Sequence, residues 1–379
     1  MFSAQKVIVI IPVYNEKEVI IETVAQILEV TKALDHFSVE ILVFDSHSTD
    51  GSAELLKTMS STEARLHFAS EPQKTGLGSA YHQAFCMAIR ELNADIVFEF
   101  DADGSHQPKY IPAMLELFNL GVDVVVGSRY VKGGSIPDNW KFHRKLLSVT
   151  GNWIARVVLT SKYKDFTSGF RATRTTILKK ILPTKFICNN YAYKLQLFWL
   201  LHQAKARIKE YPIEFIDRHK GYSKFPRNNM WESLHVVLTL RFRTLKRFMA
   251  MCVVGTGGAV AQFAVYNFFR QVATPVESNI LATECAILFN FLFNNWLTFR
   301  SSTKTAGVFA LAKKLLKFNF CSLGSMLMQV VWLAITTHYF HPNRMLENVF
   351  VGTGILFGSL SNYLLYSRWV WRPAKKRIA

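Results

Sequence analysis

Short apolar runs alternate with segments of helical periodicity through the first half of the chain. Runs rich in β-branched and aromatic residues predict buried strands at residues 7–11, 39–44, 65–68, 96–100 and 122–126. Apolar residues three or four positions apart predict helices at 18–30, 52–59 and 79–92. The alternation predicts an α/β fold, with a Rossmann-like, mostly parallel sheet that is covered by helices on both faces.

Four long apolar stretches follow one another in the second half of the chain. They lie approximately at residues 248–269, 279–299, 318–340 and 349–371, and each approaches the roughly 20 residues that a helix needs to cross a bilayer. We therefore predict that residues 248–379 form an all-α transmembrane domain with four helices. The alternative is a helical domain of a soluble protein, because core helices are also apolar.

Several polar residues interrupt these stretches. Asn290, Asn294, Asn295 and Gln329 predict contacts between helices, because lipid would leave their amides without partners. Glu284 either lines a path for lipid or lies near the interface.

Composition and charge agree with a membrane protein. Half of the 379 residues are hydrophobic, and the mean hydropathy of +0.13 is high for a soluble chain. The net charge is +18, but the basic residues flank the predicted spans or are scattered, without a basic stripe or a recognition motif. We therefore expect anionic lipid headgroups and a phosphorylated ligand as partners, and no nucleic acid.

The basic residues also predict the topology of a multi-pass protein. They gather in the loop between the second and third predicted spans and in the C-terminal tail. Such segments face the cytoplasm. With an even number of spans, the first half of the chain lies there too. Residues 1–6 lead directly into the first strand, so we expect no cleavable targeting signal. The five cysteines have neither paired nor zinc-binding spacing, so we expect reduced thiols.

Two carboxylates, Asp101 and Asp103, come directly after the predicted strand at 96–100. In an open α/β sheet, ligands bind beyond the carboxyl ends of the strands. Hard cations such as Mg²⁺ commonly bridge one or two carboxylates to substrate phosphates. The pair therefore predicts a metal site, and the alternative is a capped turn before Pro108.

Polar loops follow the other strands as well. Residues 12–16 lead into the first helix, and Asp45 ends a strand where it can accept hydrogen bonds from a ribose or nucleobase. Gly76 and Gly78 allow backbone amides at a helix N-terminus to approach an anion. The glycines do not complete the dinucleotide fingerprint, so we do not predict an NAD site. Taken singly, each of these features is also compatible with an ordinary loop or cap.

Taken in order, these segments resemble the motifs of family 2 glycosyltransferases with the GT-A fold, and more narrowly the dolichol or polyprenol phosphate mannose synthases. The motifs are residues 11–16, 45–51, 76–81, 101–106, 127–130, 133–152, 165–171 and 218–224. The resemblance implies a GT-A domain over residues 1–228, and the second half is similar to a membrane domain that some members carry. The chain departs from the family pattern at Ser46, Ser105, Lys194 and Tyr222, where aspartate, glutamine, glutamine and glutamate are common.

The resemblance also implies roles for individual residues. Asp103, Arg129 and Arg144 are expected to be catalytic, and Asp165 either orients an arginine or a sugar hydroxyl or shapes a turn. The expected donor contacts are Pro12, Tyr14, Glu16, Asp45, Gly78, Asp101, Ala102 and Asp103. The expected ligands of Mg²⁺ or Mn²⁺ are Asp101, Asp103 and Ser105, and the expected contacts of the acceptor phosphate are Arg129, Arg144, Ser148, Arg218 and Lys224. For any single arginine, the alternative is a solvated surface charge.

Residues 229–247 have apolar side chains at helical spacing with basic residues nearby, which predicts an amphipathic helix at the membrane interface. The alternative is packing against the catalytic core.

The resemblance implies inverting transfer of a hexose, most simply mannose from GDP-mannose, to a polyprenyl or dolichyl monophosphate. An ionised phosphate acceptor needs no protein base. The close alternative is a synthase that uses UDP-glucose or a related donor. A processive polysaccharide synthase is disfavoured because no Gln-x-x-Arg-Trp motif occurs. A different class, a non-catalytic scaffold or lipid translocator that only binds nucleotide, would not need these acids and arginines together.

Overall fold

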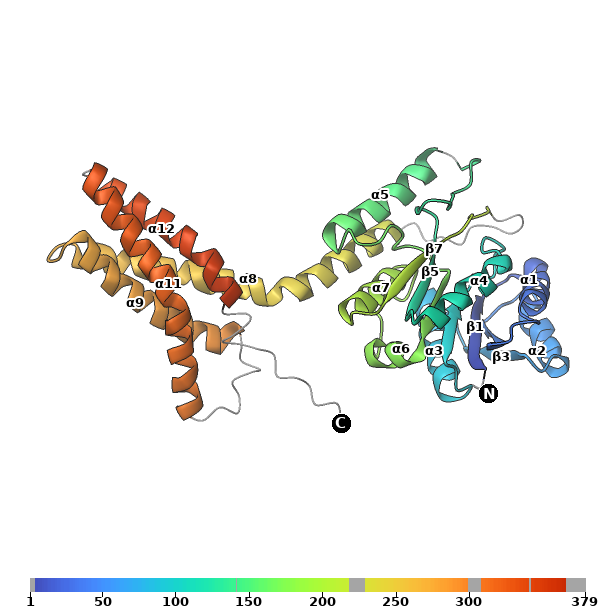
Figure 1. Cartoon of the computed structure of the whole chain (residues 1–379). Coiled ribbons are helices and arrows are strands. Elements are labelled where there is room, and N and C mark those ends of the chain that lie inside the picture. Colours follow the sequence, from blue (N-terminus) through green and yellow to red (C-terminus); the bar gives the residue numbers. More distant parts are fainter. Residues whose placement is uncertain (1–3, 141, 218–228, 299–307, 341, 366–379) are drawn as a thin grey trace. The chain divides into compact units, whose positions relative to one another are not determined.

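The chain divides into two compact units, Met1–Arg243 and Thr244–Ala379 (Figure 1). The computed structural model describes residues 4–140, 142–217, 229–298, 308–340 and 342–365.

A seven-stranded sheet forms the centre of the first unit, with strand order β3-β2-β1-β4-β6-β5-β7. Neighbouring strands are parallel, except that β6 is antiparallel to both β4 and β5. The strands are β1 (Gln5–Val13), β2 (Phe37–Asp45), β3 (Leu66–Ser70), β4 (Ile96–Glu99), β5 (Val124–Ser128), β6 (Arg171–Arg174) and β7 (Ile208–Pro212). The five predicted strands and the mostly parallel α/β fold are confirmed, whereas the sequence patterns did not predict β6 and β7.

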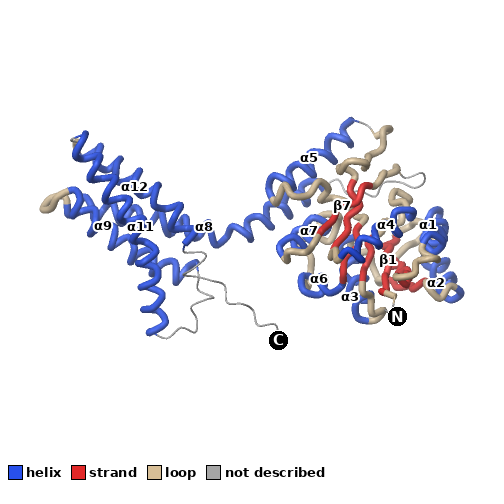
Figure 2. Tube along the Cα trace, in the orientation of Figure 1, coloured by secondary structure: helices blue, strands red, loops and turns tan. Residues whose placement is uncertain are grey.

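Helices cover both faces of the sheet (Figure 2). The three predicted helices are confirmed as α1 (Lys17–Val30), α2 (Ser52–Thr62) and α3 (Leu77–Arg90). The remaining helices of this unit are α4 (Ile111–Glu116), α5 (Phe142–Val158), α6 (Thr175–Ile181), α7 (Tyr193–Gln203) and two 3₁₀ turns, η1 (Pro108–Tyr110) and η2 (Leu117–Leu120).

The side chains of β1 show why these strands are apolar throughout and do not alternate between apolar and polar residues. Ile8 and Ile10 pack into a core beneath α3 and α7, whereas Val7 and Val9 pack into a second core beneath α1 and α4. Successive side chains of a strand point to opposite faces, and both faces are covered, so each position is buried.

Helix α8 runs without a break from Asn229 to Phe269, so the predicted interfacial segment and the first predicted span form one helix. Val236, Val237 and Leu240 are buried in the core beneath α3 and α7. Trp231 and Phe242 on the same helix are more than half exposed. Packing against the core of the first unit therefore accounts for one side of this segment, and the interfacial role of the exposed side stays a prediction.

The second unit consists of helices, as the sequence predicts. They are the end of α8, α9 (Pro275–Phe293), a π turn η3 (Asn294–Thr298), α11 (Val308–Phe340) and α12 (Arg344–Leu365). Within the described residues, three helical segments are long and apolar enough to cross a membrane: Met249–Phe269, Pro275–Trp296 and Leu315–Phe340. The fourth predicted span overlaps α12, and its end lies outside the described residues.

Polar side chains connect these helices. The Gln262 side-chain amide donates to Gln329 Oε1 (2.8 Å), Thr283 Oγ1 (3.0 Å) and Asn279 Oδ1 (3.3 Å), so α8, α9 and α11 share one buried network. The predicted inter-helix contact of Gln329 is thus confirmed. Asn295 donates to the Phe291 carbonyl of its own segment (3.1 Å), and its predicted contact between helices stays a prediction.

Candidate active site

A cavity of about 780 Å³ lies within the first unit, beyond the carboxyl ends of β1, β4 and β5. The loops after these strands supply its polar wall, and α5, α7 and the start of α8 supply most of the rest. The predicted site residues that line it are Pro12, Tyr14, Glu16, Asp101, Ala102, Asp103, Ser105, Arg129, Arg144 and Ser148. The cavity therefore unites residues that are widely separated in the sequence.

Asp101 is contacted from several sides within this cavity. The Tyr81 hydroxyl donates to Asp101 Oδ1 (3.3 Å), and Lys194 Nζ lies 3.2 Å from Asp101 Oδ2. His106 Nε2 lies 3.7 Å from the same oxygen, while His106 Nδ1 accepts the Asp101 backbone N–H (3.0 Å). In the neutral imidazole, the proton is therefore on Nε2 and faces the carboxylate.

These contacts shift the pKa values of both groups. Burial alone would raise the pKa of Asp101, but the Lys194 ammonium, together with His106 and Tyr81, outweighs burial and lowers it. Burial lowers the pKa of His106, although Asp101 acts in the opposite direction. The loop thus favours an ionised Asp101 beside a neutral imidazole.

Asp103 is positioned by its own loop. Its Oδ1 accepts hydrogen bonds from the Ser105 backbone N–H (3.1 Å) and the Ser105 hydroxyl (2.5 Å). Ser105 is buried, so its oxygen lies beside Asp103 without facing bulk solvent.

The oxygen ligands that this loop offers fit a divalent metal that is held only partly by protein. Asp101 and Asp103 both line the cavity and offer the hard oxygen ligands that Mg²⁺ and Mn²⁺ take. No cluster of three or more His, Cys, Asp or Glu side chains that could hold a metal occurs in the described part of the chain. Water and the phosphate oxygens of a substrate would complete the coordination.

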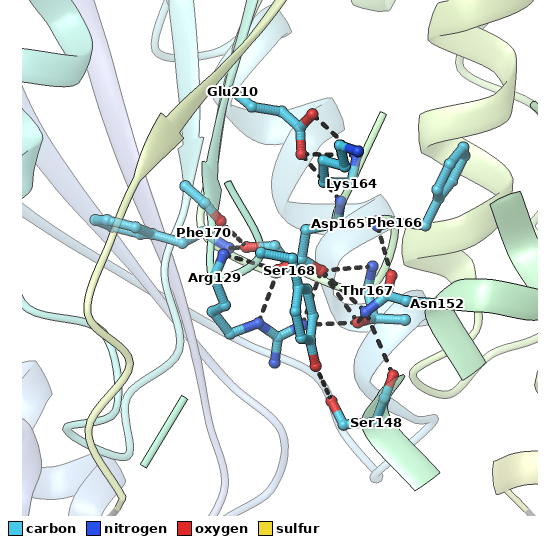
Figure 3. A network of polar contacts seen from close by, with 12 residues as sticks. Arg129, Ser148, Asn152, Lys164, Asp165, Phe166, Thr167, Ser168, Phe170 and Glu210 are labelled. Carbon is cyan, nitrogen blue, oxygen red and sulfur yellow. Dashed lines mark hydrogen bonds and ion pairs between the residues drawn. The ribbon is translucent and has the colours of Figure 1, made fainter. Parts of the chain in front are cut away.

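Arg129, which directly follows β5, is fixed by a buried carboxylate (Figure 3). Its Nε and Nη2 donate to the two oxygens of Asp165, each at 2.8 Å, and Nη2 also donates to Thr167 Oγ1 (2.7 Å). Asn152 of α5 donates to the same Thr167 oxygen (3.1 Å). Asp165 therefore orients an arginine, which was one of the roles that the resemblance implied.

The Arg129–Asp165 pair is almost fully buried, with side chains that are 9% and 0% exposed. Burial opposes both charges, but their mutual attraction lowers the pKa of Asp165 and raises that of Arg129. The guanidinium lines the cavity, and Nη1 makes no hydrogen bond to any described residue. Asp165 and Thr167 thus orient one edge of the Arg129 guanidinium, and Nη1 offers hydrogen-bond donors to a ligand in the cavity.

Arg144 and Ser148 lie on α5, one helical turn apart. Arg144 stacks on the Trp140 ring, with 4.0 Å between the guanidinium carbon and the ring centroid, and Nη1 donates to Asp217 (3.0 Å). Ser148 Oγ lies 2.6 Å from the hydroxyl of Tyr130, which follows Arg129 in the chain. This places both α5 residues beside the Arg129 end of the cavity.

Some predicted residues lie elsewhere. Asp45 is buried and does not line the cavity; its Oδ2 accepts from the Ser48 backbone N–H (3.0 Å), and its Oδ1 has no hydrogen-bond partner among the described residues. The Gly78 amide donates to the Asn189 carbonyl (2.6 Å), so the anion contact predicted for it competes with an internal bond. Arg218 and Lys224 lie outside the described residues.

The cavity also has an apolar wall that the motifs did not reveal. Its members come from α5, α7 and α8, and they are Leu147, Ile154, Leu195, Leu234 and Val237. Helical periodicity was the available signal for the α8 members, since they fall within the predicted amphipathic segment.

Comparison with known families agrees with the two units. Residues 8–182 match the model described as glycosyl transferase family 2, and residues 250–371 match the model described as GtrA/DPMS, transmembrane domain.

Named relatives match over most of their length. The chain is 30% identical over 347 residues to the dolichol-phosphate mannosyltransferase of Pyrococcus furiosus, covering 89% of this chain and 94% of the relative. It is 34% identical over 234 residues to the polyprenol monophosphomannose synthase of Mycolicibacterium smegmatis, covering 62% of this chain and 86% of the relative. Among solved structures, mannosyl-3-phosphoglycerate synthase from Rubrobacter xylanophilus aligns with a TM-score of 0.47 at 15% identity, over 64% of this chain and 74% of that one.

The expected GT-A fold is consistent with the observed sheet, and the expected family is confirmed over nearly the full length of the chain. The chain belongs to glycosyl transferase family 2, in the group of the dolichol- and polyprenol-phosphate mannosyltransferases, and carries a GtrA/DPMS transmembrane domain.

Proposed function

We propose that this enzyme transfers mannose from GDP-mannose to a polyprenyl or dolichyl monophosphate, with inversion at the anomeric carbon, at the cytoplasmic face of a membrane. The observation that carries the proposal is the composition of the cavity. An acidic loop with Asp101 and Asp103, the arginines Arg129 and Arg144, and an apolar wall all line the same space.

The arginines suit an acceptor that is itself an anion. A phosphate monoester has a second pKa near 6 and is largely dianionic at neutral pH, so it attacks without a protein base. Guanidinium groups bind phosphate through paired hydrogen bonds, and Arg129 is already oriented for this by Asp165. The protein's task is to hold two anions close together.

The reaction is a single displacement. An acceptor phosphate oxygen forms a bond to the anomeric carbon while the bond from that carbon to the donor's diphosphate breaks, and the nucleoside diphosphate leaves. In-line attack converts an α-linked donor into a β-linked lipid product. Asp101 and Asp103 would hold Mg²⁺ or Mn²⁺, which supplies positive charge to the leaving diphosphate.

The donor's nucleoside has a complementary buried acceptor. Asp45 Oδ1 is buried without a hydrogen-bond partner in the described part of the chain, and an unpaired buried acceptor is costly. Asp45 itself does not line the cavity, but the next residue, Ser46, does, so a ribose hydroxyl or a base N–H would reach Asp45 Oδ1 only if this loop shifts when the donor binds. Pro12, Tyr14 and Glu16 line the cavity together with Ser46.

The apolar surfaces suit a lipid acceptor. Beyond the apolar wall of the cavity, α5 carries a stripe of apolar side chains at intervals of three or four residues, and each is about half exposed or more: Phe142, Leu146, Val149, Trp153 and Val157. A stripe of this kind is stable against acyl chains and costly in water. We infer that α5 contacts the bilayer surface, where a polyprenyl phosphate presents its headgroup.

The orientation follows from charge. The basic residues around 300–317 and 372–377 face the cytoplasm under the positive-inside rule, which places the catalytic unit and the C-terminus there.

The test uses the full chain in lipid nanodiscs with radiolabelled GDP-mannose and a short-chain polyprenyl phosphate. We expect labelled lipid with Mg²⁺ or Mn²⁺ and none with EDTA. Asp103→Ala should reduce transfer about a thousandfold or more, because a metal supplies several kcal/mol of charge stabilisation. Asp35→Ala is the matched control and should retain full turnover. Asp35 is exposed and precedes the N-terminal end of β2, whereas the cavity lies beyond the carboxyl ends of the strands.

Near wild-type transfer by Asp103→Ala would refute the metal assignment. A donor panel with UDP-glucose, GDP-glucose and GDP-mannose tests the sugar and nucleotide separately. Faster transfer from UDP-glucose would replace the proposed donor while leaving the reaction type intact.

A further inference from the structure

Lys194 is a buried cation within the acidic part of the cavity. It is the second residue of α7, and its side chain is 7% exposed. Its ammonium lies 3.2 Å from Asp101 Oδ2 and 5.7 Å from the centroid of the Tyr191 ring. A lysine is seldom buried to this extent unless it is paired.

The backbone around Lys194 leaves space for its side chain. A methyl group on Gly169 would overlap the Lys194 ammonium and would lie 2.8 Å from its Cε and 3.1 Å from Asp101 Oδ2. Gly169 lines the cavity beside Lys194, so a side chain at this position would displace the ammonium. The space that the Lys194 ammonium occupies therefore depends on the absence of a side chain at position 169.

The ammonium is only partly satisfied by protein. It has three donors, yet among the described residues its one hydrogen-bond acceptor is Asp101. The residue lines the cavity, so its remaining donors are available to a ligand there. Arg129, by contrast, is already neutralised by the Asp165 carboxylate.

We propose that Lys194 binds the diphosphate of the donor and shares Asp101 with the divalent metal, as a second, permanent cation of the donor site. The inference rests on the proposed function, since it assumes a donor with a diphosphate. Two carboxylates neutralise one divalent cation, so Lys194 gives the assembled site a surplus positive charge. That charge attracts a diphosphate, and it also opposes metal binding when no nucleotide is present.

Two effects of opposite sign follow for Lys194→Gln in the full chain. The affinity for GDP in EDTA should fall about tenfold, since one charge-assisted hydrogen bond is lost. The affinity for Mn²⁺ without nucleotide, measured by the EPR signal of free Mn²⁺, should rise about tenfold because Asp101 loses its competing cation. Titration calorimetry measures the first quantity.

Three further variants make the test decisive. Lys194→Arg keeps the charge and should keep both affinities within about threefold. Gly169→Ala displaces the ammonium and should shift both affinities in the same directions as Lys194→Gln. Lys179→Gln, on the exposed side of α6, controls for the loss of a positive charge and should change neither.

General damage to the cavity would weaken GDP and Mn²⁺ binding together, and that result would overturn the proposal. An unchanged Mn²⁺ affinity in Lys194→Gln would overturn it as well. If Mn²⁺ binds more tightly to Lys194→Gln but the wild-type enzyme does not use GDP-mannose, the pairing with Asp101 stands and the proposed donor is wrong.

Discussion

The proposed acceptor region, which contains Arg129, Arg144 and Ser148, holds its two arginines in opposite ways at its two ends. Arg129, after β5, is buried and bound by Asp165 and Thr167, whereas the Arg144 side chain on α5 is 45% exposed and pairs with Asp217 while stacked on Trp140. A buried pair is rigid and is expensive to break, and an exposed pair contributes little to stability. The buried geometry of Arg129 suits a guanidinium that is held in place before substrate binds. The exposed geometry of Arg144 suits a side chain that can exchange its carboxylate partner for a phosphate.

Arg129→Ala should have the largest effect. It leaves Asp165 buried without its cation, which costs about 3–5 kcal/mol of unfolding free energy, and under the proposed function it also removes a guanidinium that binds the acceptor phosphate. We expect a large loss of thermal stability together with loss of transfer. Thermal denaturation followed by tryptophan fluorescence, alongside the radiolabel assay, measures both.

A surface ion pair is the matched control for that variant. Arg207 pairs with Asp123 at 3.3 Å, but its side chain is 68% exposed. Arg207→Ala should cost no more than about 1 kcal/mol and leave transfer unchanged. Equal destabilisation by the two variants would mean that burial does not distinguish these pairs.

Arg144→Ala should separate binding from stability. The unfolding free energy should change by about 0.5 kcal/mol or less, as for most surface substitutions. The KM for the polyprenyl phosphate should rise about tenfold to a hundredfold, because charge-assisted hydrogen bonds contribute about 1.5–3 kcal/mol. Steady-state kinetics with a varied acceptor concentration check this. An unchanged acceptor KM would contradict a phosphate contact by Arg144.

The same contrast explains what the sequence could predict. Asp101 and Asp103 directly follow an apolar strand, so local pattern alone places them at the carboxyl edge of the sheet. Lys194 reaches Asp101 from 93 positions away, and no local pattern encodes that contact. Arg129, Asp165 and Thr167 likewise meet only through the fold, and only the family motifs indicated them.

Strand β6, one of the two strands that were not predicted, was missed for a related reason. Strand β6 has four residues, of which three are Arg171, Thr173 and Arg174, so it has no apolar signature. It lies in the interior of the sheet, where Arg171 pairs with Glu99 on the neighbouring strand, with Arg171 Nε 2.5 Å from Glu99 Oε2. A buried ion pair replaces apolar burial there, and hydropathy cannot detect it.

Tyr130→Phe should have the smallest effect and gives the sharpest comparison of the two ends. Tyr130 follows Arg129 in the chain, and its hydroxyl lies 2.6 Å from Ser148 on α5, so this hydrogen bond connects the rigid end to the adaptable one. Its loss removes about 0.5–1.5 kcal/mol, which predicts a rise of about twofold to tenfold in the acceptor KM with little change in kcat. If Tyr130 acts only by orienting Ser148, then Tyr130→Phe should add nothing to Ser148→Ala, and the double-mutant cycle should be non-additive. Additive effects would instead mean that Tyr130 and Ser148 contribute to acceptor binding independently, and that the two ends of the region are not coupled through this bond.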